Sequence, residues 1–161
     1  VGFTSFCEKS DPELVVETLQ GLVEKFEEAF IDHNLEKIKT VGDAIVAVSG
    51  LSSMDESSVK NCVDCSYKLK DIANSYSMPW DLHVGIHFGS LVAGTIGKKT
   101  VQYDILGKSV NIAFNICDMS EANQILISSD AWMTARSEIN VNSIGLKKLK
   151  SGQEVEILEC K

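Results

Sequence analysis

Segments with helical periodicity and segments with strand periodicity interleave irregularly along this chain, and that order limits the folds available to it. A long helical pattern after Asp11 gives way to two strand-like runs around Gly42, and the two periods continue to alternate up to the C-terminal end. Such an order favours an antiparallel-rich sheet covered by helices over a doubly wound parallel sheet. We therefore predict an α+β fold of ferredoxin-like kind, in a single domain over residues 1–161.

The predicted helices rest on their start signals and on apolar residues at three- and four-residue steps. Asp11 is a good N-cap and Pro12 suits the first turn, so a helix should run from there to about His33. Its apolar stripe is Val15, Leu19, Leu22, Phe26 and Phe30. Further helices are predicted over residues 57–76, where Met78-Pro79 stops the pattern, 109–119 and 130–135.

The predicted strands show period-two alternation or β-branched apolar runs. Two of them, over residues 35–40 and 44–48, flank Gly42-Asp43, which is a hairpin signal. Two more, over 82–88 and 91–97, are joined by Gly89-Ser90. The remaining predictions are a strand at 124–128, two strands around Lys150-Ser151-Gly152, and the end of a strand at Val1–Thr4.

Composition excludes some classes of function. The formal net charge is −8 and the pI is near 4.8, with no basic stripe, so we expect no nucleic-acid partner. An RNA-binding sheet would also need exposed aromatic residues and basic flanks, which the chain lacks. No apolar run approaches the roughly 20 residues of a membrane span, so a membrane would be reached only through regions outside this chain.

The five cysteines are an odd number, which fits a reducing compartment better than a disulfide framework. Cys62 and Cys65 would lie about one turn apart on a helix. No second ligand pair at zinc-site spacing accompanies them, and no strand precedes them as in a redox motif. We expect reduced and mostly buried thiols.

Three segments contain residues suited to chemistry. Asp43, at the hairpin tip, could hold a hard cation, although a Gly-Asp turn is more often structural. Closely spaced glycines in residues 84–97 either leave room for a backbone or a ligand or form a tight turn and bulge. His83 and His87, on one strand face, are expected to be solvated rather than to bind metal. Asn111, inside a predicted helix, costs some helix propensity.

Together these segments resemble the catalytic domain of the class III adenylyl and guanylyl cyclases in order and spacing, over about residues 1–128. Val1-Gly2-Phe3-Thr4 is similar to the end of the family's Asp-Ile-Val-Gly-Phe-Thr, and residues 39–43 to its second metal segment. Residues 84–97 are similar to its Val-Gly-Ile-His-x-Gly…Ala-Gly-x-x-Gly stretch, and residues 103–113 to its Tyr-Asp-x-x-Gly…Val-Asn-x-Ala series. Beyond Ser128 only a loose Leu-Lys-x-Gly match remains.

The resemblance implies an adenylyl cyclase that forms 3′,5′-cyclic AMP and pyrophosphate from ATP with two Mg²⁺ or Mn²⁺ ions. The active site would lie at the interface of a homodimer, or of a heterodimer with another cyclase domain. The protein would be cytoplasmic, or the cytoplasmic domain of a membrane-anchored protein. By the same resemblance Asp43 would bind metal, and the family's first metal aspartate would precede Val1, so the domain is expected to be N-terminally truncated.

The resemblance also implies the substrate contacts. Backbone groups around Gly2, Phe3 and Thr4 would hold the phosphates. Lys39 and Asp104 match the pair that reads the purine: a lysine donor and a carboxylate acceptor suit adenine, whereas guanine-selective members have glutamate and cysteine there.

The remaining implied contacts lie in the predicted helix 109–119 and near the C-terminus. Asn111 would position the ribose, and Lys150, chosen over Lys147 and Lys148, would contact the triphosphate.

One implied catalytic position departs from the family pattern. The transition-state arginine, four residues after Asn111, is Asn115 in this chain. An uncharged amide can donate a hydrogen bond but brings no charge. A nearby lysine such as Lys108 could supply the missing charge instead. Two alternatives to the adenylyl cyclase follow: a degenerate cyclase homology domain that binds nucleotide or regulates a partner, and a guanylyl cyclase.

Overall fold

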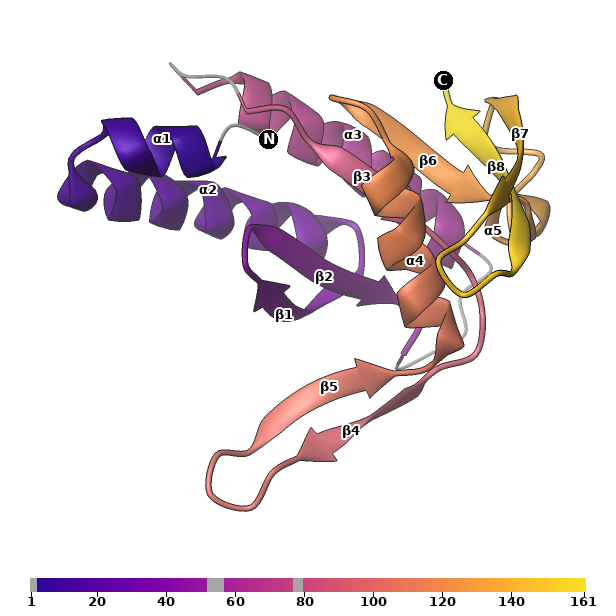
Figure 1. The fold of residues 1–161 in the computed structure, drawn as a ribbon, viewed down its shortest axis with the longest axis horizontal. Helices are drawn as coiled ribbons and strands as arrows, with labels where there is room; N and C mark the ends of the chain where they lie inside the picture. The colour runs from indigo at the N-terminus through magenta and orange to yellow at the C-terminus, as the bar shows by residue number, and fades with distance from the viewer. Residues whose placement is uncertain (1–2, 52–56, 77–79) are drawn as a thin grey trace.

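The structure, a computed structural model, describes residues 3–51, 57–76 and 80–161, and for residues 3–5 the backbone alone. Its helices are α1 (Phe3–Lys9), α2 (Pro12–Asp32), α3 (Ser58–Asn74), α4 (Lys108–Met119) and α5 (Ser129–Thr134). Its strands are β1 (Leu35–Val41), β2 (Ala44–Ser49), β3 (His83–Ile86), β4 (Val92–Ile96), β5 (Gln102–Leu106), β6 (Gln124–Ser128), β7 (Val141–Lys148) and β8 (Glu154–Cys160). The α+β prediction is confirmed, with helices and hairpins interleaved (Figure 1).

The main sheet has the strand order β3-β6-β8-β7, with β3 parallel to β6 and the other neighbours antiparallel. The central strand β6 is buried on both faces, which explains its nearly continuous apolar sequence. Ile125 and Ile127 pack in one core with residues of α3 and α5, whereas Leu126 packs in another with Ile112 and Ile116 of α4. The sheet therefore lies between α3 and α5 on one face and α4 on the other.

A second hydrophobic core joins α1, α2 and α3 to the β1–β2 hairpin. Asp11 caps α2, since its side chain accepts a hydrogen bond from the Glu13 N–H at 2.9 Å, as the sequence predicts. The buried face of α2 contains Leu22, Phe26 and Phe30. Helix α3 lies against both cores and so ties this part of the molecule to the main sheet.

The predicted strand end at Val1–Thr4 is wrong for the residues that the structure describes. Phe3 and Thr4 begin α1, and Val1 and Gly2 lie outside the described residues. Further along α1, Phe6 is buried and meets Trp80 edge to face, with ring centroids 5.2 Å apart. A helix satisfies its own backbone and buries this aromatic ring, which a lone strand end would not do.

Two features of the strands differ from the expectation. Residues 102–106 form β5, which the sequence pattern had not indicated, and β5 pairs with β4 in a two-stranded antiparallel ribbon. Strands β3 and β4, joined through Gly89-Ser90, belong to different sheets. The β4–β5 ribbon consequently extends away from the body of the molecule (Figure 1).

The cysteines are all free, as expected; Cys65 and Cys160 are buried, Cys62 and Cys117 are partly exposed, and Cys7 is exposed. Burial raises the pKa of the Cys62 thiol to about 12 and that of Cys65 to about 11. The Cys65 thiol also donates to the Ala29 carbonyl on α2, at 3.6 Å. These thiols are therefore protonated packing groups, not nucleophiles.

Among the described residues, no helix has the length and apolar character that crossing a bilayer requires.

The solvated face predicted for His87 is wrong. His87 is half-buried at the end of β3, and its Nδ1 lies 2.8 Å from the hydroxyl of Ser128, which is fully buried and caps α5 by accepting from the Ala131 N–H. The Ser128 hydroxyl can donate to Nδ1 when the imidazole is neutral. Burial lowers the pKa of His87 below its ordinary value of 6.5, against a smaller opposing effect of the Asp130 charge.

This pairing predicts a loss of stability in mild acid. Because the folded pKa of His87 is depressed, its contribution is complete above pH 6.5 and is lost as the pH falls from there through the folded pKa. The melting temperature should fall between pH 7 and pH 5, and His87→Gln should flatten that dependence. The pKa values of Asp104 and Glu159 are also lowered, but from ordinary values of 3.8 and 4.5, so their effects belong to a more acidic range. An unchanged slope in His87→Gln would assign the acid sensitivity to other groups.

Candidate functional site

Among the predicted site residues, Lys39 on β1 and Asp104 on β5 form an ion pair with each other. The Lys39 Nζ lies 2.7 Å from Oδ1 and 2.9 Å from Oδ2 of the Asp104 carboxylate, and both side chains are partly shielded. The two residues are 65 positions apart in the chain. Fold topology thus brings together the pair that the sequence comparison predicted to read a purine.

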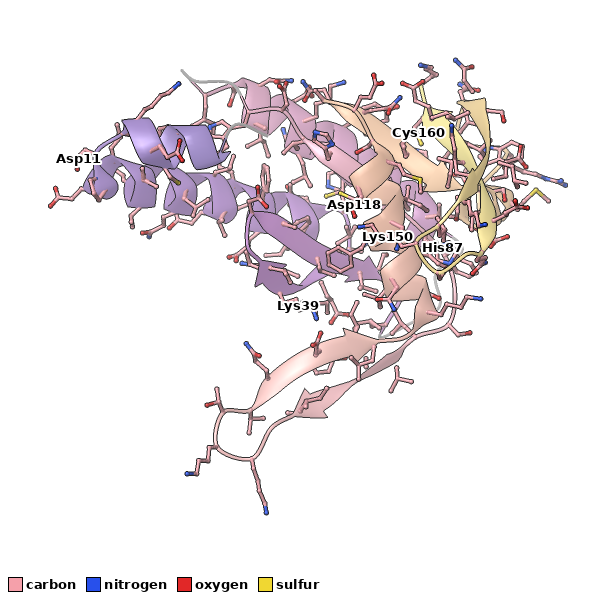
Figure 2. All side chains as sticks on the ribbon, in the orientation of Figure 1. Asp11, Lys39, His87, Asp118, Lys150 and Cys160 are labelled. Carbon is pink, nitrogen blue, oxygen red and sulfur yellow. The ribbon has the colours of Figure 1, made fainter. Side chains whose placement is uncertain are left out.

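The Asp104 carboxylate is held in its charged form. The hydrogen bond from Lys39 is the main reason that its pKa lies below the ordinary value, and the N–H of Ile105, which donates to Oδ1 at 2.7 Å, adds to the effect. The carboxylate therefore presents acceptor lone pairs and the ammonium presents donors. A donor and an acceptor thus lie side by side at this contact (Figure 2 labels Lys39).

Asp43 lies at the tip of the β1–β2 hairpin and is exposed to solvent. Gly42 supplies the positive φ of +63° that this two-residue connection requires. The charge of Asp43 is the smallest of the effects that raise the pKa of Cys117, after burial and the charge of Asp118. A single exposed carboxylate suits Mg²⁺, which is bound through one or two carboxylates with phosphates and waters as the other ligands.

No group of three or more His, Cys, Asp and Glu side chains that could hold a metal ion occurs in the described part of the chain. A metal at Asp43 would accordingly need ligands from the substrate, from water or from outside the described residues.

Helix α4 presents Asn111, Asn115 and Asp118 at spacings of four and three, hence on one side. Its position is set by Gly85 of β3, where a Cβ atom would lie 2.3 Å from the backbone nitrogen of Cys117 and 2.5 Å from the carbonyl oxygen of Ala113. Strand and helix therefore touch backbone to backbone. The sequence prediction that these glycines allow a close approach is confirmed at Gly85, and the approaching group is a helix.

Asn111 is exposed, and its backbone carbonyl oxygen accepts a hydrogen bond of 2.6 Å from the Asn115 side chain. The oxygen of the same Asn115 side chain accepts from the Lys150 N–H at 3.1 Å. The Lys150 ammonium is 2.5 Å from Asp118. Asn115 and Lys150, both predicted from the sequence, are thus in contact on one side of α4, and Asp118, which the sequence prediction missed, pairs with Lys150 (Figure 2 labels Lys150 and Asp118).

Other predicted residues lie apart from this cluster. Lys147 and Lys148 are on β7, an edge strand, where charged side chains also discourage edge pairing. Lys108 is exposed at the first position of α4. Of the three expected phosphate-binding residues, Gly2 lies outside the described residues, and Phe3 and Thr4 are the first two residues of α1.

Comparison with known proteins gives one consistent family. The family model described as the adenylate and guanylate cyclase catalytic domain matches residues 1–158. The receptor-type guanylate cyclase gcy-23 of Caenorhabditis elegans is 32% identical over 138 residues, which are 81% of this chain and 13% of that protein. An adenylate cyclase of Mycobacterium bovis is 28% identical over 160 residues, or 92% of this chain and 36% of that protein. The chain thus spans a minor part of these relatives.

Solved structures agree on the fold. The adenylyl cyclase CyaB from P. aeruginosa superposes with a TM-score of 0.90 at 22% identity, over 99% of this chain and 88% of that one. Guanylate cyclases and adenylate cyclases are thus both similar to this chain. Its nucleotide preference has to be argued from its own residues.

Proposed function

The chain belongs to the family of class III adenylyl and guanylyl cyclase catalytic domains, and on that basis we propose a specific activity for it. It is an adenylyl cyclase that converts ATP to 3′,5′-cyclic AMP and pyrophosphate. The observation that carries this proposal is the Lys39–Asp104 pair. A lysine donor aimed at adenine N1 and a carboxylate accepting from the N6 amine complement adenine. Guanine has a donor, N1–H, and an acceptor, O6, at the corresponding edge. Its N1–H would face the Lys39 donor and its O6 would face the Asp104 acceptor, so neither contact could form.

The reaction is attack of the ribose 3′-oxygen on the α-phosphorus. The new O3′–Pα bond closes the cyclic ester, the bond from Pα to the bridging oxygen breaks, and its electron pair leaves with pyrophosphate; the hydroxyl proton passes to solvent. Asn111 orients the ribose, which contributes through positioning rather than proton transfer. Lys150 contacts the triphosphate.

Asp43 would hold a divalent ion, Mg²⁺ or Mn²⁺, in this scheme. When bound, two such ions lower the pKa of the attacking hydroxyl and neutralise charge on the leaving phosphates. The exposed position of Asp43 at a fixed hairpin tip fits this task, because the ion must reach the phosphates of a nucleotide.

A dimer, homomeric or with another cyclase domain, is part of the proposal. The β4–β5 ribbon projects from the body, and large apolar side chains on it are exposed, among them Val92 at 69% and Val101 at 60%. Leu106 and Tyr103 are about half exposed. Apolar residues on an extended arm indicate a surface that another protein covers. In such a dimer the active site forms from residues of both protomers.

The test of nucleotide preference is the formation of cyclic AMP from ATP and of cyclic GMP from GTP with Mn²⁺, in the parent and in the double variant Lys39→Glu, Asp104→Cys. The parent should prefer ATP, and the double variant should shift the ratio of kcat/KM values toward GTP by at least about tenfold, since mismatched polar groups then face adenine. Lys37→Ala, which removes the neighbouring β1 lysine and its ion pair with Glu27, is the matched control and should leave the ratio unchanged.

A ratio that stays constant in the double variant would refute the purine-reading role of the pair. A folded protein that forms neither product would favour the second candidate, a degenerate domain that binds nucleotide or regulates a partner. Asn115 is the specific residue that favours this second candidate, because it stands where the family has its arginine.

A further inference from the structure

Asn115 uses both ends of its carboxamide. Its Nδ2 donates to the backbone carbonyl oxygen of Asn111 at 2.6 Å, and its Oδ1 accepts from the backbone N–H of Lys150 at 3.1 Å. The second bond crosses from α4 to the loop between β7 and β8. An arginine side chain has donors only and could not accept that N–H. The residue that departs from the family pattern therefore makes a contact that the family's residue could not make.

The loop around Lys150 is fixed on both sides of this contact. Leu149 is buried and packs in one core with Ile112 and Ile116 of α4. Its N–H donates to the Gln153 carbonyl oxygen at 2.8 Å, and the Gly152 N–H donates back to Leu149 at 2.9 Å. The backbone of Lys150 is therefore held beside α4 by packing, by a tight turn and by Asn115.

The Lys150 side chain lies along the same face of α4. Its ammonium is 2.5 Å from the Asp118 carboxylate, and the two side chains are 78% and 53% exposed. An ion pair so open to water is weak and exchanges readily with an anionic ligand. Lys108, in contrast, makes no side-chain hydrogen bond or ion pair with the part of the chain that the structure describes.

We propose that Asn115 is a positioning residue for Lys150, with Asp118 as the resting counter-ion, so that Lys150 supplies on this face of α4 the positive charge that Asn115 lacks. This inference rests on the proposed function, because the charge matters there only when the phosphates of the nucleoside triphosphate or of the pyrophosphate product are bound. In this arrangement one lysine serves the α4 face that in other members of the family has an arginine of its own.

A double-mutant cycle on turnover tests the shared charge. Lys150→Ala should lower kcat by about 10² to 10³, the usual effect of losing one such donor. Asn115→Arg brings its own guanidinium but loses the loop contact, so adding Lys150→Ala to it should cost less than about tenfold. Lys150→Arg should restore most of the lost rate. An equal cost of Lys150→Ala in both backgrounds would mean that the two positions act independently and would overturn the proposal.

Titration with inorganic pyrophosphate provides a readout that does not need turnover. Lys150→Ala and Asn115→Ala should weaken pyrophosphate binding, the first by removing the charge and the second by releasing the loop. Asp118→Asn should tighten it by up to about fivefold, because a competing carboxylate is lost. The matched control is Asp64→Asn, which removes the Lys60–Asp64 pair on α3 and should change nothing.

The two readouts separate the possible failures. The expected pyrophosphate pattern without any cyclic nucleotide would refute the cyclase and leave the positioning of Lys150 in place. Turnover in the parent, with pyrophosphate affinity unaffected by Lys150→Ala, by Asn115→Ala or by Asp118→Asn, would refute the positioning and leave the cyclase in place.

Discussion

Asp43→Ala is expected to abolish cyclic nucleotide formation, with a loss in kcat of at least about 10³-fold. A divalent ion contributes several kcal/mol of charge stabilisation to phosphoryl transfer, and each 1.4 kcal/mol corresponds to about tenfold in rate. Asp43 is the described residue that we assign to that ion. The substitution leaves the fold intact, because Asp43 is exposed and the turn conformation depends on Gly42. The measurement is cyclic AMP formation over a range of Mn²⁺ concentrations.

The control for this substitution is Asp71→Ala, which removes an exposed carboxylate from α3, outside the β1–β2 hairpin itself. Both variants should melt within a few degrees of the parent, since surface substitutions of this kind change the free energy of unfolding by less than about 0.5 kcal/mol. Turnover in Asp43→Ala that matches the parent at every Mn²⁺ concentration would show that the hairpin tip holds no catalytic metal.

Gly85→Ala is expected to destabilise the domain by about 3 kcal/mol or more. The added Cβ would lie 2.3 Å from the Cys117 nitrogen, 2.5 Å from the Ala113 oxygen and 2.8 Å from the Cys117 Cα. All three are backbone atoms, so no side-chain rotation relieves the collision, and α4 has to move away from β3. The melting temperature should fall by roughly 6–12 °C for a domain of this size. Activity should fall as well, because α4 carries Asn111 and Asn115.

Gly94→Ala is the matched control for the collision. Gly94 is also a strand glycine, in β4, but a Cβ atom there meets nothing within 4 Å, and its φ is not in the left-handed region. Its melting temperature should be within a few degrees of that of the parent. A Gly85→Ala variant as stable as Gly94→Ala would mean that β3 and α4 are not in direct backbone contact.

The errors made from the sequence alone have a common physical origin. Strand β5 is short and exposed on most positions, so its pattern carries little hydrophobic signal, and its pairing with β4 is what makes it a strand. The helix at Phe3–Lys9 depends on the burial of Phe6 against Trp80, a residue far along the chain. His87 directly follows β3, and its imidazole contacts the buried hydroxyl of Ser128 on β6. In each case a distant partner decides the local outcome.

The local elements and the family could be predicted from the sequence because their causes are local. The cap at Asp11, the apolar stripe of α2 and the Gly42-Asp43 hairpin depend on neighbours within a few residues. The motif spacing was enough to name the cyclase family and to select candidate residues. It also identified Asn115 as an uncharged departure from the family's arginine, but it did not show which groups the carboxamide contacts.

The tertiary structure alone decided which of those residues touch. Lys39 meets Asp104 across 65 positions, and Asn115 meets Lys150 across 35, and each contact exists because strands and helices distant in sequence pack together. Such contacts depend on the relative placement of whole elements, which is set by buried side chains and by the space left at Gly85. Asp118 shows the difference most clearly: in the sequence it is one more surface carboxylate, and in the fold it is the counter-ion of Lys150.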